Sequence, residues 1–115
     1  MIGMTPLSFE LGITNALLHT VPRGYLLQAV SCLFVNINPD VAAAIWLFRV
    51  PPGLTPDESN VLLSGVTINR YHDFKSWKVF PAGYEIWGYC EVPPGANYLV
   101  TLHIDGSMRK IEYRT

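Results

Sequence analysis

The chain has 115 residues, of which half are hydrophobic and only 15% are charged, whereas an average soluble protein is about 25% charged. Its net charge of −1 at pH 7, with eight basic residues spread along the chain, gives no basic surface for nucleic acid. A small domain has much surface for its volume, so a monomer cannot bury this many hydrophobic residues in its interior. We therefore expect apolar outer faces that are covered by neighbouring subunits. A monomeric apolar sandwich is the alternative.

An extended N-terminal arm is predicted for residues 1–15, followed by one domain over residues 16–115. Gly3, Pro6 and Gly12 interrupt any regular element in the arm. Such a segment is expected to matter for attachment to a partner and little for folding. Its apolar residues are the predicted anchors on the partner: Ile2, Met4, Leu7, Phe9 and Leu11.

Four proline–glycine turns interrupt the apolar runs of the chain. Proline presets φ for a turn, and glycine accepts the positive φ that a side chain resists. The turns are Val21–Tyr25, Val50–Gly53, Phe80–Tyr84 and Val92–Gly95. Residues that favour strands flank each of them, as expected for a chain that folds back and forth in short antiparallel strands.

Three strands are predicted in the first half of the chain, at Ala16–Thr20, Tyr25–Ile37 and Ala42–Val50. The second and third are apolar on both faces, so their outer sides need a cover. Trp46 and Phe48 are therefore candidate partner contacts. A helix is the competing interpretation of the third segment, but its short length, flanking prolines and aromatic content favour a strand.

A short helical turn is predicted near residues 56–60. Thr55 is expected to cap it, Pro56 suits its first position, and Glu58 would complete a capping box.

The last part of the chain alternates apolar and polar residues with period two, over residues 98–105 and again over 110–114. Asp105-Gly106 between these segments predicts a hairpin. With about eight strands in all, we expect an all-β fold: a single antiparallel β-sandwich of jelly-roll-like type.

No catalytic, metal-binding or cofactor-binding pattern accompanies these turns, so we expect no enzyme activity and no cofactor. The three histidines have no metal-ligand spacing, and the serines lie in no nucleophile elbow. Cys32 and Cys90 lie in apolar strands and are expected to be free thiols. The first six residues lack the features of a signal peptide, and no apolar run approaches the about 20 residues of a membrane span. We expect folding in a reducing cytoplasm and no membrane contact.

From Leu18 to Ile111 the order of motifs resembles a family of small β-sandwich proteins from tailed-bacteriophage virions. The motifs are Thr-Val-Pro-x-Gly at Thr20–Gly24, a strand ending in Asn36, Val-Pro-Pro-Gly and Thr-Pro-Asp within Ile45–Asp57, Leu-x-Ser-Gly-Val-x-Ile at Leu62–Ile68, Pro-Ala-Gly-Tyr-x-Ile at Pro81–Ile86, and Leu-His-Ile-x-Gly at Leu102–Gly106. The resemblance implies a decoration (cement) protein of the capsid, or a small tail or fibre accessory domain.

One segment departs from the pattern of that family. Arg70–Trp77 is bulkier and more aromatic than the short polar turn expected there, and is interpreted as a loop specific to this protein's contacts. Tyr71, Phe74 and Trp77 are therefore further candidate interface residues.

The leading hypothesis is a structural virion protein, assembled in the host cytoplasm, which binds and stabilises the capsid shell. Its partners would be the major capsid protein or other virion subunits, and copies of itself in a dimer or trimer. The alternative is a tail-tip or fibre domain that recognises a host glycan, with Trp77 and Tyr71 as stacking residues.

Overall fold

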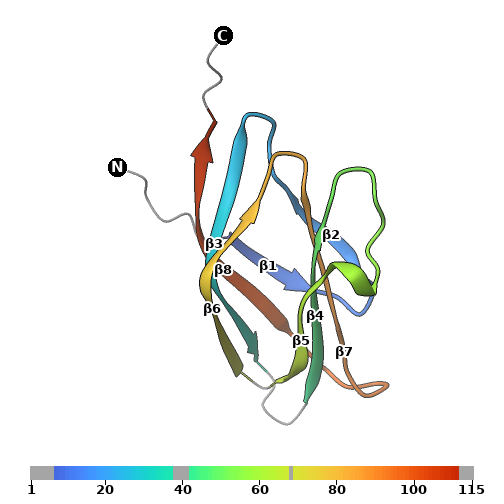
Figure 1. Ribbon diagram of the computed structural model, residues 1–115. Coiled ribbons are helices and arrows are strands. Elements are labelled where there is room, and N and C mark those ends of the chain that lie inside the picture. The colour runs from blue at the N-terminus through green and yellow to red at the C-terminus, as the bar shows by residue number, and fades with distance from the viewer. Residues whose placement is uncertain (1–6, 38–41, 68, 112–115) are drawn as a thin grey trace.

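The computed structural model describes residues 7–37, 42–67 and 69–111, with the backbone alone at 67, 69–73 and 75–77 (Figure 1). Its elements are eight strands and one short 3-10 helix. In chain order they are β1 (Leu7–Leu11), β2 (Ala16–Thr20), β3 (Tyr25–Asn36), β4 (Ala43–Val50), η1 (Glu58–Asn60), β5 (Val61–Thr67), β6 (Asn69–Phe80), β7 (Glu85–Glu91) and β8 (Val100–Lys110).

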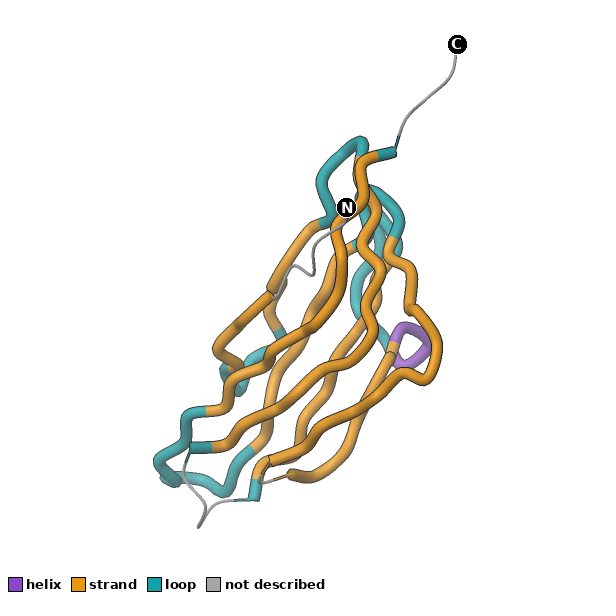
Figure 2. The backbone as a smooth tube through the Cα atoms, turned by 90° about the vertical axis from the view of Figure 1, so that its left-hand side faces the viewer, coloured by secondary structure: helices purple, strands orange, loops and turns teal. Residues whose placement is uncertain are grey.

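Two four-stranded antiparallel sheets pack as a sandwich. One sheet has the order β1-β8-β3-β6 and the other β2-β7-β4-β5. Successive strands alternate between the sheets, with β4 and β5 as the exception, and η1 lies on the side of the sandwich (Figure 2). This arrangement is jelly-roll-like and confirms the predicted fold class.

The four proline–glycine turns form as predicted. Gly24, Gly53, Gly83 and Gly95 all have φ between 77° and 84°. In each turn the residue after glycine donates its N–H to the carbonyl of the first proline, over 3.0–3.3 Å. The first three turns meet at one end of the sandwich, where Gly83 N donates to Val21 O over 2.9 Å, and the fourth lies at the opposite end (Figure 1).

The core lies between the sheets and is filled by the inward residues of alternating positions. The largest fully buried side chains include Phe34 of β3, Phe80 of β6, Ile45 of β4 and Leu102 of β8. For β8 this is the face that the period-two pattern of the sequence predicts, because Val100, Leu102 and Ile104 are all buried.

The predicted irregular arm is wrong for Leu7–Leu11, which form the edge strand β1. β1 pairs with β8 from Leu7↔Ile104 to Leu11↔Val100. Its alternate residues Leu7, Phe9 and Leu11 face inward, because β8 already presents an apolar inner face for them. The two glycines and the proline that suggested an irregular segment lie before and after the strand in the sequence.

The predicted Asp105-Gly106 hairpin is also wrong, because β8 continues through both residues to Lys110. Gly106 pairs with Ala29 of β3, next to a register irregularity between Ala29 and Ser31. A Cβ at Gly106 would lie 2.5 Å from Gln28 O. The glycine therefore serves a close approach of two strands and not a turn.

The helical turn forms, but Asp57 and not Thr55 caps it. The Asp57 carboxylate accepts the Ser59 N–H over 2.9 Å, and Asn60 Oδ1 accepts the Asp57 N–H over 3.3 Å. This reciprocal pair is a capping box shifted by two residues from the predicted one.

The segment Arg70–Trp77 is not a loop but part of strand β6. Asn69 to Asp73 pair with β3, and pairing resumes at Lys78 after an irregularity opposite Val30. The extra residues are accommodated there, and Phe74 is directed into the core.

Cys32 and Cys90 are buried and form no disulfide, as predicted. Burial raises the pKa of the Cys90 thiol, whose Sγ lies 3.7 Å from Leu11 O. We therefore expect neither thiol to react with an aromatic disulfide reagent at pH 8 in the native protein, because both side chains are buried and the raised pKa makes the Cys90 thiolate scarce as well. In denaturant without reductant, titration should find two thiols per chain; finding none would contradict the reduced state.

Candidate interaction surface

The outer face of the β2-β7-β4-β5 sheet carries a row of aromatic side chains. Trp46 pairs with Tyr89 across β4 and β7, and Phe48 pairs with Trp87, so the four residues share one face. The Trp46 and Tyr89 rings are stacked, with centroids 4.8 Å apart and planes 6° from parallel. The Phe48 ring lies 6.2 Å from Tyr89 at 12°. Such close stacking fixes the rings in place before any partner binds.

Exposed aliphatic residues extend this row along both edges of the sheet. Val66 of β5 is 68% exposed, and Val61 at the start of β5 and Leu17 of β2 are also exposed. We call the whole set the aromatic face: Leu17, Trp46, Phe48, Val61, Val66, Trp87 and Tyr89. A sheet face that carries this much apolar surface is typical of interaction sites on soluble proteins.

Polar groups border the aromatic face. Trp87 Nε1 donates to Glu85 Oε1 over 3.1 Å, which anchors the indole at one end of the row. Burial, and secondarily the charge of Glu91, raise the pKa of the Tyr89 hydroxyl, which therefore stays protonated at neutral pH. The face thus combines fixed rings with hydrogen-bonding groups at its margin.

A groove of about 390 Å³ lies between the aromatic face and the segment that contains η1. Trp46, Phe48 and Tyr89 are its aromatic lining residues, and Asp57 and Glu58 also line it. The groove therefore combines aromatic and acidic side chains.

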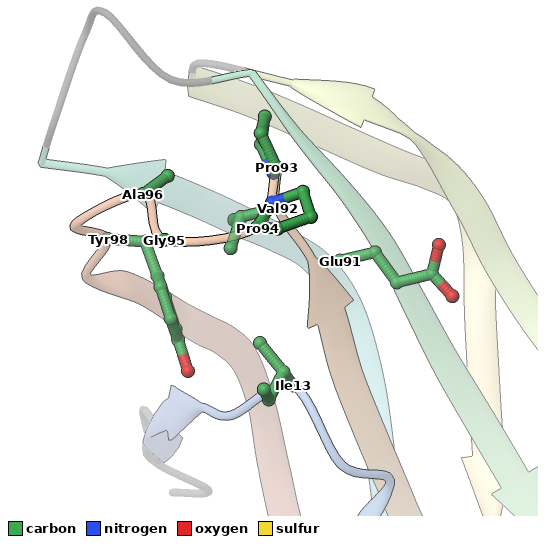
Figure 3. Close-up of a pocket in the computed structure, with 8 residues that line it drawn as sticks. All are labelled: Ile13, Glu91, Val92, Pro93, Pro94, Gly95, Ala96 and Tyr98. Carbon is green, nitrogen blue, oxygen red and sulfur yellow. The ribbon is translucent and has the colours of Figure 1, made fainter.

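A second hollow, of about 360 Å³, lies beside the turn that follows β7. Figure 3 shows the Ile13 side chain near Tyr98 and the Val92–Pro94 segment, while the Glu91 carboxylate extends away from them. Ile13 is 59% exposed. This hollow is mainly apolar and presents no cluster of charged groups.

Three of the predicted interface residues are buried within the chain itself. Leu11 is 1%, Phe48 6% and Phe74 7% exposed. Leu11 and Phe74 belong to the core between the sheets. Phe48 does lie on the outer face, but the Tyr89 ring and the segment around η1 cover it.

The other predicted residues have different outcomes. Leu7 and Phe9 are half-buried in β1 and pack against the core. Trp46 is half-buried at the centre of the aromatic face. Ile2, Met4 and the side chains of Tyr71 and Trp77 lie outside what the structure describes.

Sequence reasoning did not select Trp87, Tyr89, Leu17, Val61 or Val66. The signal for two of them was present, because Trp87 and Tyr89 alternate with the buried Ile86, Gly88 and Cys90 in β7. That alternation shows that they point outward, but only the sheet order shows that they join Trp46.

One hydroxyl–imidazole pair resembles part of a catalytic arrangement. Ser8 Oγ lies 2.8 Å from His103 Nδ1 across β1 and β8, and His103 Nε2 lies 3.2 Å from Thr101 Oγ1. A histidine that activates a nucleophile is usually oriented by a carboxylate, and here a threonine hydroxyl has that place. The pair is exposed on a sheet face, so we interpret it as a cross-strand contact.

The remaining chemistry is sparse. Among the described residues, no three or more His, Cys, Asp or Glu side chains are grouped so as to hold a metal ion. Burial lowers the pKa of His19, whose ring lies 6.4 Å from that of Phe9 between β1 and β2. In the same part of the chain, we find no helix with the length and apolar character that crossing a bilayer requires.

Comparison with known proteins gives no match to a family model and no significant match to a curated protein. The virion resemblance thus rests on the motifs quoted above.

Proposed function

We propose that the chain is a non-enzymatic structural subunit of a tailed-phage virion, which binds and stabilises the capsid shell as a decoration protein. The observation that supports this most is the aromatic face, an apolar sheet surface with stacked rings at its centre. Ordered aromatic side chains are the usual anchors of protein interfaces.

The chemistry of the face suits a protein partner. Burying the exposed Val66, Leu17 and Val61 would remove apolar surface from water, at about 25 cal/mol per Å². The rings of Trp46 and Tyr89 already hold one another, so little side-chain entropy is lost on docking. We further propose that copies associate as a dimer or trimer, because contacts repeated over a shell add in avidity.

A charge placed on the aromatic face should abolish attachment without unfolding the domain. We expect Val66→Asp to weaken binding to purified phage particles at least tenfold, because a buried unpaired carboxylate opposes docking. Val79→Asp is the matched control, since Val79 is an exposed valine at a position paired with Gln28 in the other sheet.

Both variants should keep the wild-type melting temperature, and cosedimentation with particles measures binding. Equal binding of the two variants, or absence of the protein from purified particles, would contradict the proposal.

A host glycan is a second candidate ligand of the same surface. Sugars stack on accessible aromatic rings, and the groove is lined by Trp46 and Tyr89 together with Asp57 and Glu58, whose carboxylates can accept hydroxyl hydrogen bonds. A glycan array separates the candidates: specific glycan binding that Trp46→Ala removes would favour a tail or fibre domain.

A further inference from the structure

We infer that Arg49 forms a binding site for a carboxylate group at the end of the sandwich where three of the proline–glycine turns meet. Arg49 is the next-to-last residue of β4 and pairs with Ile86 of β7, whose side chain is fully buried. By strand alternation it lies on the inward face with Leu47 and not on the aromatic face. The positive charge of Arg49 therefore lies on the inward side of its sheet, near one end of the sandwich.

Two aromatic rings hold the guanidinium in place. Its central carbon lies over Tyr84, 4.9 Å from the ring centroid, and over Phe80 at 5.8 Å. The Tyr84 backbone is fixed on both sides, because its N–H donates to Pro81 O and its carbonyl accepts the Val21 N–H. Phe80 is fully buried. The arginine is thus positioned by rigid groups, as a preformed binding site requires.

The rings leave the hydrogen-bonding capacity of Arg49 unused. A ring face attracts the positive charge, but guanidinium N–H groups need acceptors in their own plane. The Arg49 Nε is buried and meets no acceptor in the described part of the chain. A buried charged donor without an acceptor costs free energy, so a ligand that brings an acceptor would gain a favourable interaction here.

The cavity in front of Arg49 has the chemistry of an anion site. It encloses about 170 Å³, and its polar lining comes from Arg49, Tyr84, Ser59 and Asn60, with no carboxylate among the lining residues. Asn60 Oδ1 already accepts the Asp57 N–H, so its amide NH₂ group stays available as a donor. The lining therefore offers one cation, together with the neutral donors of Asn60 and Tyr84.

Two acidic side chains of the neighbouring segments already have hydrogen-bond donors. Asp57 Oδ1 accepts from Ser59 N at 2.9 Å and Ser59 Oγ at 2.5 Å. Glu85 Oε1 accepts from Trp87 Nε1. In the described part of the chain no group accepts a hydrogen bond from Arg49 Nε, so the carboxylate of a ligand can supply the acceptor.

A carboxylate fits this site better than a phosphate. Its two oxygens match the planar fork of a guanidinium, and its single charge suits a cavity whose other walls are Pro51, Val61 and Leu62. Val61 also lines the groove on the aromatic face. The carboxylate belongs either to a free small acid or to an acidic side chain of a docked protein. The site does not depend on the proposed role in a virion.

Nuclear magnetic resonance of the full ¹⁵N-labelled chain tests the inference through the Arg49 Nε–H signal. Sodium acetate, N-acetyl-aspartate amide and inorganic phosphate are titrated separately, each against sodium chloride at equal ionic strength. We expect saturable shifts with both carboxylates. Tighter binding of the aspartate amide would identify a protein side chain as the ligand, and tighter binding of acetate a free acid.

Variants of Arg49 separate charge from geometry. Arg49→Lys keeps the charge but loses the planar guanidinium that binds both carboxylate oxygens at once, so it should bind acetate at least about tenfold more weakly. The shifts of the backbone amides of Ser59 and Asn60 measure this binding. Arg49→Met should lose the saturable shift yet melt no lower than wild type, because an unpaired half-buried cation is removed. Arg23→Met, at an exposed arginine of the same end, should bind as wild type does.

Three results would overturn the inference: acetate shifts no larger than those of chloride, unchanged binding in Arg49→Met, or phosphate binding tenfold tighter than acetate. If Arg49→Met failed to fold, the wild-type titration and Arg49→Lys would still decide the question.

Discussion

Leu11→Ala should lower the free energy of unfolding by about 2–5 kcal/mol, the range for a leucine removed from a packed core. Leu11 is 1% exposed and pairs with Val100 of β8. Its carbonyl accepts from Cys90 Sγ of the opposite sheet, and its Cδ2 lies 3.4 Å from the position of a Cβ on Gly88. Leu11 therefore joins the two sheets, although it lies in an edge strand near the N-terminus.

Thermal and urea denaturation followed by circular dichroism measure this effect. For a domain of this size the loss corresponds to a melting temperature lower by roughly 10–20 °C. Ile13→Ala is the matched control, because Ile13 is two residues away and 59% exposed; it should change stability by less than about 0.5 kcal/mol. If Leu11→Ala melted like wild type, β1 would contribute nothing to the fold, and residues up to Leu11 would form an attachment arm after all.

The turns and the long strands were predictable because their signals are local. A positive φ after proline is decided by four adjacent residues, and all four such glycines adopt it. Strand β2 has the predicted bounds, and β3 and β4 each differ from prediction by one residue. Period-two alternation was enough to identify the inward face of β8.

The errors concern features that depend on a distant strand. Asp105-Gly106 is a good hairpin signal locally, and only the approach of Gln28, far away in sequence, explains the glycine. Leu11 looked like an unburied anchor because the chain around it has turn residues. Its place in the core depends on β8, which comes late in the sequence.

The candidate surface was predictable in part for the same reason. Trp46 on a strand apolar on both sides was a sound indication of an outer apolar face. Its companions Trp87 and Tyr89 come from β7, and no local pattern says that β7 lies beside β4. The site around Arg49 was the least predictable from local sequence. The aromatic rings that contact it belong to Phe80 and Tyr84, at the two ends of the turn between β6 and β7.

Gly106→Ala should destabilise the domain by about 3 kcal/mol or more, since a clash against backbone cannot relax by a side-chain rotation. The added Cβ would lie 2.5 Å from Gln28 O and 3.1 Å from Ala29 Cα, both on β3. Relief requires β8 to move away from β3, which weakens the ladder that joins the two strands at the centre of their sheet.

The direction of the stability change in Gly106→Ala is what tests the close approach of the two strands. Alanine normally stabilises a strand or loop relative to glycine, because it restricts the unfolded chain. Gly12→Ala provides that comparison: its Cβ would meet nothing nearer than Thr14 N at 4.0 Å, so stability should stay within about 0.5 kcal/mol of wild type or rise. Urea denaturation of both variants measures the difference. If Gly106→Ala were as stable as wild type, the two strands would not approach each other this closely, and the Asp105-Gly106 hairpin would again be the better interpretation.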